Sequence, residues 1–191
     1  MELDEIIRTE RTIRKFEQKE IPAEVIDRIL NNVRMAHCAN NRQLLRYVVV
    51  QSKEKRDVVG NMVHYAARLP KEIGEPKEDE KAMAYIVITK PAVSNHLVDI
   101  DSGIASEVIC ATAWDEGVGS CIMQNFKASE MDAFLKLPED RTSRLVISLG
   151  YPKITSSVVE MPESGDTAYY LDENFNYYVP KMKAEDISEK I

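Results

Sequence analysis

Positive side chains gather near the start of the chain, in the stretch "ERTIRKFEQKEIP" over residues 10–22. Arg11, Arg14 and Lys15 fall close together, and Thr12 adds a hydroxyl between them. Guanidinium groups offer planar pairs of N–H donors that suit a phosphate or a polarised carbonyl. A solvated charge run is the plainer interpretation of such a stretch, and a site for a small anion is the functional one.

The rest of the chain carries the opposite charge. Its 191 residues include 25 Lys and Arg against 32 Asp and Glu, which gives a formal net charge of −7. Sequence-independent binding of nucleic acid depends on a broad basic surface, so this class of function is not expected. A local basic cluster on an acidic protein favours a small anionic ligand such as a phosphate.

A second polar stretch, "AHCANNRQ" over residues 36–43, follows a predicted helix. Amide side chains can hydrogen-bond the edge of a flat heterocycle, and small side chains let such a ring approach the backbone. Alone, either stretch is more typical of a solvated face or a helix-ending loop. Together and in this order they are far more specific.

The helices and strands that must position these residues are predicted from the spacing of apolar residues and from residues that begin or end such elements. Helices are predicted over residues 3–9, 22–33, from Ser52 to about 67, 99–114, and from Ser129 to before Pro138. Strands are predicted over 47–50, 84–88, 120–123 and 144–150, with 70–81 as an exposed loop and a polar, tyrosine-rich tail from 151. Because 99–114 is rich in small apolar residues, that helix should be central or at an interface. The mixed order predicts one layered α+β or α/β domain.

Composition excludes several other classes. No apolar run approaches the length of a membrane span, and the mixed, acidic N-terminus resembles neither a secretory signal nor a transit peptide. Cys38, Cys110 and Cys121 lack CxxC spacing, which favours reduced thiols and a cytoplasmic location. The three histidines lack ligand spacing, so no metal site is predicted.

Two further stretches resemble known sequence motifs. "GVGSCI" at 117–122 lacks the third glycine of a dinucleotide fingerprint and follows a helix where a strand is needed. "LVDIDSG" at 97–103 is similar to the DxDx nucleophile motif of a class of phosphatases, with Gly103 in place of Thr or Val. The favoured interpretation is that Asp99 and Asp101 cap a helix, and the phosphatase stays a minor alternative.

With these residues in place, the sequence resembles the FMN-dependent nitroreductase family, in a short subclass. The matching stretches are "RTIRKFEQKEIPAEVIDRIL" (11–30), "RMAHCANNRQLLRYVVV" (34–50), "VDIDSGIASEVICATAWDEGVGSC" (98–121), "LVISLGYP" (145–152) and "VPKMK" (179–183). The resemblance implies a single domain over 1–191 with an α+β, three-layer sandwich fold. It further implies a central mixed or antiparallel sheet flanked by helices, and a C-terminal tail that extends onto a partner subunit in an obligate homodimer.

The resemblance also implies a cofactor site at the dimer interface. Residues carried over from the family's motifs fall into four groups: Arg11, Thr12 and Arg14 for the FMN phosphate and the flavin N1/O2 edge; Cys38, Ala39, Asn41 and Gln43 for the flavin of the partner subunit; Gln124 and Asn125 near the flavin N5 and O4; Lys181 and Lys183 for the phosphate. No side chain is named as a catalytic acid or base, because the chemistry belongs to the flavin.

The function that the resemblance implies is a ping-pong oxidoreductase. NAD(P)H gives hydride to the flavin N5 and leaves, and an electron-poor acceptor such as a nitroaromatic or a quinone then enters. A non-catalytic or redox-sensing flavin-binding protein is the alternative. Three departures from the family pattern bear on affinity and substrate choice: Glu10 stands where many members have Arg, His37-Cys38 replaces Pro-Ser, and Leu44-Leu45 replaces Pro-Trp.

Overall fold

The centre of the protein is a four-stranded antiparallel sheet. The computed structural model describes residues 1–66 and 68–191, and the sheet has the strand order β1-β2-β4-β3. Its strands are β1 (Arg46–Val50), β2 (Ala84–Pro91), β3 (Gly119–Met123) and β4 (Arg141–Gly150). All three strand pairs are antiparallel, so the α+β fold with a central antiparallel sheet is confirmed.

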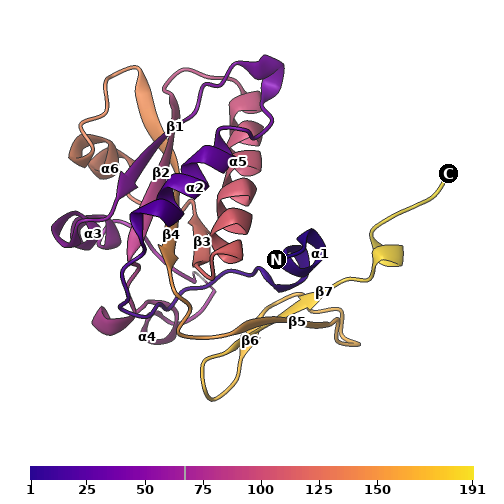
Figure 1. The fold of residues 1–191 in the computed structure, drawn as a ribbon. Coiled ribbons are helices and arrows are strands. Elements are labelled where there is room, and N and C mark those ends of the chain that lie inside the picture. Colours follow the sequence, from indigo (N-terminus) through magenta and orange to yellow (C-terminus); the bar gives the residue numbers. More distant parts are fainter. Residues whose placement is uncertain (67) are drawn as a thin grey trace.

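Helices cover both faces of this sheet, which gives three layers (Figure 1). The helices are α1 (Leu3–Thr9), α2 (Ala23–Val33), α3 (Lys53–Gly60), α4 (Lys71–Gly74), α5 (His96–Asp115) and α6 (Ala128–Phe134). Three short 3₁₀ turns are η1 (Ala39–Asn41), η2 (Glu78–Glu80) and η3 (Ala184–Asp186). Of the helices in the described part of the chain, none has the length and apolar character to cross a bilayer.

The period-two alternation of β2 divides the core into two clusters. Ile86 and Ile88 point into the layer formed with α2 and α5. Tyr85 and Val87 point the other way, into a cluster that includes Val59 of α3 and residues of α6. Because both faces are covered, β2 is a nearly continuous apolar run, and its first six residues are buried.

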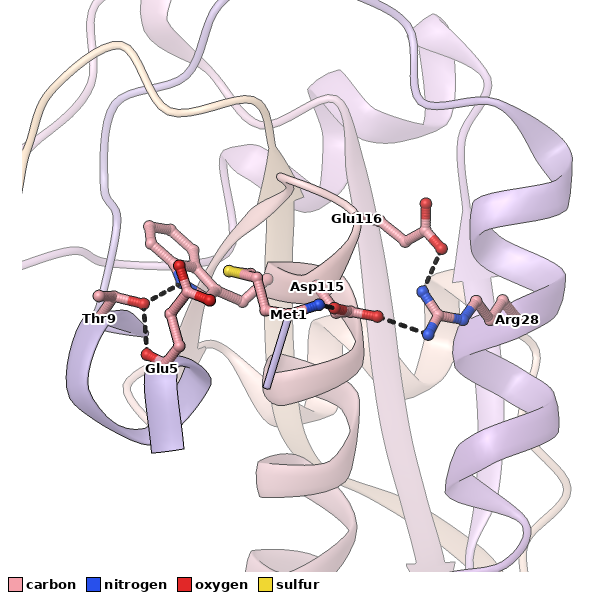
Figure 2. Close-up of polar contacts among 7 residues, drawn as sticks. Met1, Glu5, Thr9, Arg28, Asp115 and Glu116 are labelled. Carbon is pink, nitrogen blue, oxygen red and sulfur yellow. Dashed lines mark hydrogen bonds and ion pairs between the residues drawn. The ribbon is translucent and has the colours of Figure 1, made fainter. Parts of the chain in front are cut away.

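A set of polar contacts fixes α1 against the carboxyl end of α5 (Figure 2). The indole Nε1 of Trp114 donates to the hydroxyl of Thr9 at 2.8 Å. Arg28 of α2 forms ion pairs with both Asp115 and Glu116, which ties the same end of α5 to α2. Helix α1 leads directly into residues 10–22, called here the basic segment. These contacts therefore set where the basic segment begins.

The tail beyond residue 151 forms a second sheet, which the sequence did not predict. Strand β7 (Tyr177–Lys181) lies between β5 (Ser156–Glu160), to which it is parallel, and β6 (Tyr170–Leu171), to which it is antiparallel. This sheet lies beside α1 in Figure 1. Tyr177, the first residue of β7, is fully buried.

Most predicted elements are confirmed, and the errors concern local details. The N-cap of α5 is Asn95, whose side chain accepts from the backbone N–H of Leu97, so the interpretation of Asp99 and Asp101 as helix caps was wrong. Helix α6 begins after Lys127, so Ser129 is inside it.

Two boundary predictions also differ from the structure. Helix α3 already ends at Gly60, whereas the predicted end at about residue 67 falls on Ala67, outside the described residues. The predicted loop over 70–81 contains α4 and η2, and the side chain of Glu80 is buried there.

Candidate functional site

The basic segment is held against the end of the central sheet, where two of its side chains pack directly on glycines of β3 and β4. The N–H of Ile13 donates to the carbonyl of Ser120 on β3 at 2.8 Å. A Cβ added at Gly119 would lie 2.7 Å from Ile13, and one added at Gly150 would lie 2.7 Å from Phe16. Ile13 and Phe16 are buried, so glycine at the two strand positions lets the segment dock.

Four of the residues carried over from the family motifs line one cavity of about 230 Å³. They are Thr12, Arg14, Gln124 and Asn125, from the basic segment and from the segment after β3. The rest of the lining consists of His64, Tyr65, Ala66, Arg68, Cys121, Ile122, Met123 and Tyr169. The fold therefore brings two distant stretches of sequence to one concave site.

Arg14 is fixed in this cavity by the C-terminal sheet. Its guanidinium carbon lies 5.0 Å from the centre of the Tyr169 ring and 4.9 Å from that of Tyr177. The Nε of Arg14 is buried and has no hydrogen-bond partner among the described residues. Burial raises the pKa of Tyr177, although the charge of Arg14 opposes the shift. The arginine thus keeps one unused N–H donor at the cavity.

Arg11 and Lys15, on either side of Arg14 in the sequence, do not line the cavity. Arg11 folds back on α1, where its guanidinium donates to the carbonyls of Ile7 and Glu10, and its Nε is buried without a partner in the described structure. Lys15 is buried and its Nζ lies 3.2 Å from the carboxylate of Glu80. Of Arg11, Arg14 and Lys15, Arg14 alone therefore lines the cavity.

The wall behind Asn125 comes from a segment that sequence reasoning missed. His64 donates its backbone N–H to the carbonyl of Asn125 at 3.1 Å, and Lys127 donates to the carbonyl of Met62 at 3.0 Å. These bonds flank an antiparallel bridge between Val63 and Phe126. The sequence places these residues inside a predicted helix that runs to about residue 67, because Met62 and Val63 continue its apolar spacing, whereas α3 ends at Gly60.

Other groups around the cavity have defined protonation or pairing. Burial raises the pKa of Cys121 to about 11, so this thiol is protonated at neutral pH and does not act as a thiolate. The carboxylate of Glu75 lies 3.5 Å from Nδ1 of His64 and accepts a hydrogen bond from the N–H of Tyr65. Burial, together with the nearby carboxylate of Glu107, raises the pKa of Glu10.

The second predicted group lies elsewhere in the chain. Cys38 and Gln43 line a separate cavity of about 240 Å³ near Asp101. Ala39 donates its backbone N–H to the Asp101 carboxylate at 2.9 Å, and Asn41 lies in the same short loop. The backbone φ is positive at Asn41 (52°) and Gln43 (49°), a conformation that costs energy for residues other than glycine.

The late basic pair is also apart from the first cavity. Lys181 ends β7 and Lys183 follows it, and both side chains are exposed. Neither lines the cavity that contains Arg14. Within one chain, the structure thus brings together Thr12, Arg14 and the pair after β3, but not the loop at residues 38–43 or the two lysines.

Comparison with known proteins gives one family. Residues 7–151 match the Nitroreductase family model. A protein of Archaeoglobus fulgidus named "Putative NADH dehydrogenase/NAD(P)H nitroreductase" is 28% identical over 155 residues, which cover 78% of this chain and 84% of that protein.

Solved structures show the same fold. A nitroreductase family protein from Clostridium novyi NT has a TM-score of 0.69 at 27% identity, covering 80% of this chain and 86% of that one. An FMN-dependent nitroreductase from Clostridium difficile R20291 has a TM-score of 0.66 at 23% identity, with 80% and 88% covered. A nitroreductase family protein from Streptococcus pneumoniae TIGR4 is covered completely, as is this chain, with a TM-score of 0.71 at 16% identity.

Proposed function

The chain belongs to the nitroreductase family, and we propose that it is an FMN-dependent oxidoreductase that uses NAD(P)H as electron donor. The observation that carries this proposal is the cavity in which Arg14, with a buried and unpartnered Nε, lies together with Thr12, Gln124 and Asn125. The names of similar proteins, one an NAD(P)H nitroreductase and another FMN-dependent, point to the same donor and cofactor.

The lining of the cavity fits one edge of a flavin mononucleotide. Arg14 and Thr12 supply donors for carbonyl or phosphate oxygens, and the backbone at Gln124 and Asn125 lies along the same wall. The chemistry that bound FMN supplies is hydride transfer from NAD(P)H, by way of the flavin N5, to an electron-poor acceptor such as a nitroaromatic or a quinone, in ping-pong order.

The contribution of Arg14 is a positive charge held in place before the cofactor arrives. The adjacent rings of Tyr169 and Tyr177 restrict the guanidinium, so little reorganisation is needed when negative charge develops at the N1/O2 edge. A preorganised donor of this kind contributes roughly 3 kcal/mol in enzyme sites.

We propose a homodimer in which the two groups of predicted residues that contact one flavin come from different subunits. The proposal is supported by their location in separate cavities, because Arg14 lines one and Cys38 and Gln43 line another. Helix α5 supports this arrangement, because apolar side chains occur on its outer face as well as its buried one. Ile100 is 54% exposed, and nothing lies within 4 Å of a Cβ added at Gly103.

The C-terminal residues complete the proposed interface. Residues 181–191 are all exposed in the single chain, including Met182 and Ile187. We assign this segment to contacts with the partner subunit, where Lys181 and Lys183 approach the phosphate of a flavin.

The absorption spectrum of the purified protein tests the proposal. A yellow protein that NAD(P)H bleaches supports the reductase, and a yellow protein inert to both nucleotides supports the flavin-binding alternative. A protein that stays colourless after FMN is added overturns both. Arg14→Ala should lower FMN affinity or the rate of flavin reduction, and no change in either would refute the assigned role of Arg14.

Mixed subunits test the shared site. Arg14→Ala disables one group, and Asn41→Gly disables the other without opposing the positive φ of residue 41. Each variant alone should lack both sites, whereas an equal mixture of refolded subunits should regain about one quarter of the sites, through mixed dimers with one intact site each. No recovery in a mixture that sedimentation shows to contain dimers would refute the shared site.

A further inference from the structure

The cavity that contains Arg14 is positive on a protein that is strongly negative. Two of its lining residues are arginines, Arg14 and Arg68, and among the described residues no carboxylate lines it. The formal net charge of the whole chain is −7. His64 also lines the cavity, and its Nδ1 lies 3.5 Å from the carboxylate of Glu75, the one such contact recorded for a lining side chain within the described structure.

The two arginines occupy different positions in the site. Arg14 is half-buried against two adjacent tyrosine rings and belongs to the cofactor group proposed above. Arg68 is exposed on the wall that the sequence did not predict. In that wall, the N–H of His64 donates to the carbonyl of Asn125, and the N–H of Leu69, which follows Arg68, donates to the carbonyl of Ala66 at 2.8 Å. Arg68 therefore lies at the cavity as an exposed side chain, whereas Arg14 is half-buried in it.

From this placement we propose that Arg68 selects substrates that carry an anionic group. The proposal rests on the proposed oxidoreductase function and assigns a substrate class to the same site. The ligand chemistry is a phosphate, sulfonate or carboxylate outside the reacting ring, which a guanidinium binds in bidentate fashion. Two substrates could bring it: the additional 2′-phosphate that distinguishes NADPH from NADH, or an anionic acceptor.

The charges around Arg68 explain why this selection is confined to the cavity. The acidic surface repels anions over roughly the 10 Å screening length of 0.1 M salt, whereas the two arginines attract them at the site. Glu75 lies near the same wall, but its carboxylate is engaged by His64 and the N–H of Tyr65. Because Arg68 is exposed, its attraction for one anionic group should change binding by about three- to ten-fold.

The test compares matched substrates that differ in one anionic group. One pair is NADPH and NADH, and the other is 1,4-naphthoquinone-2-sulfonate and 2-methyl-1,4-naphthoquinone with NADH as donor. Arg68→Gln should lower kcat/KM for the anionic member of at least one pair by about three- to ten-fold and leave the neutral member within about two-fold. Arg68→Lys should restore most of the loss. Arg8→Gln removes an exposed arginine from α1, away from this cavity, and should leave both ratios unchanged.

The affected pair identifies the source of the anion. A loss for NADPH alone assigns Arg68 to the nucleotide, and a loss for the sulfonate alone assigns it to the acceptor. In either case, raising NaCl to about 0.5 M should reduce the wild-type preference towards that of Arg68→Gln. The proposal would be overturned if Arg68→Gln changed kcat/KM equally for both members of each pair, or for none of the four substrates. The flavin spectrum of the variant should be unchanged in this comparison.

A binding measurement keeps the inference separate from catalysis. Titration calorimetry of 2′,5′-ADP against 5′-AMP, and of naphthalene-2-sulfonate against 2-methylnaphthalene, needs no turnover. Wild type should bind the more anionic member of a pair more tightly, and Arg68→Gln should lose that difference. If the protein proves colourless, the proposed function fails, and these titrations still decide whether Arg68 binds an anion.

Discussion

Replacement of Lys15 by methionine tests how the N-terminal segment is held. The Nζ of Lys15 lies 3.2 Å from the carboxylate of Glu80, and the two side chains are only 5% and 11% exposed. The ammonium group also lies 4.7 Å from the centre of the Phe175 ring. The pair therefore joins the basic segment to η2 and to the C-terminal sheet, directly beside Arg14.

The expected cost follows from what the substitution leaves behind. In Lys15→Met, the Glu80 carboxylate keeps the hydrogen bond from the N–H of Lys77 at 3.0 Å, and Lys153 is 3.9 Å away. Removing one partner of a buried ion pair costs about 3–5 kcal/mol, and the residual contacts place this case near 3 kcal/mol. Changing Glu80 to glutamine as well removes the unpaired charge, so the double variant should lose only about 1 kcal/mol.

Urea unfolding at pH 7 and a fixed protein concentration measures these values. Lys55→Met makes the same change on the exposed face of α3 and should stay within about 0.5 kcal/mol of wild type. A loss below about 1 kcal/mol for Lys15→Met, or a double variant as unstable as the sum of its single variants, would refute a buried, coupled pair.

The pH dependence gives a second check on the same pair. Burial raises the pKa of Glu80, but the Lys77 N–H and the Lys15 ammonium outweigh it and the net pKa is lowered. The stabilisation from Glu80 is therefore present above the ordinary carboxyl pKa and is lost as the pH falls below about 4. In Lys15→Met the pKa of Glu80 should rise, so the deficit should shrink in acid.

Three further substitutions test individual contacts. Burial and Glu107 raise the pKa of Glu10, so stability should fall as the pH rises through the window between the ordinary and the raised pKa. Glu10→Gln should abolish that fall and raise the free energy of unfolding measured in urea at pH 7. Gly150→Ala would place a Cβ 2.7 Å from Phe16, and should cost about 2 kcal/mol and weaken FMN binding in a titration. Hydrogen bonds from cationic side chains on β2 and β4 lower the pKa of Asp99. Because its side chain is 39% exposed, Asp99→Asn should lower the free energy of unfolding by less than about 1 kcal/mol at pH 7. In thermal unfolding near pH 2, where the carboxylate is protonated, the variant and wild type should be equally stable.

The elements that could be predicted from sequence are those with strong periodicity and buried faces. The run "AYIVI" at 84–88 lies inside β2, and "RLVISLG" at 144–150 lies inside β4. The tail could not be predicted in the same way, because β5 and β7 pair in parallel across a long connection. Short strands of mixed polarity, such as "SSVVE" in β5, carry little periodic signal and depend on tertiary pairing.

The site was predictable only to the extent that its residues lie in motifs. Thr12 and Arg14 were carried over from one motif and line the cavity together with the pair after β3. Lys15 looked equivalent to Arg14 in the sequence, yet burial against Glu80 removes it from the site. Nothing local distinguishes the two cations, because the carboxylate that captures Lys15 lies in a segment that composition predicts to be an exposed loop.

The placement of Arg14 depends on both ends of the chain. Its guanidinium lies against Tyr169 and Tyr177 of the C-terminal region, while the preceding residue, Ile13, is bonded to β3. A free arginine side chain loses up to about 2 kcal/mol of rotamer entropy when it is fixed. Here that loss occurs during folding, so a ligand that binds Arg14 meets a charge already in position. The C-terminal sheet, although distant in sequence from the basic segment, is therefore part of the physical basis of the anion binding that we propose at this cavity.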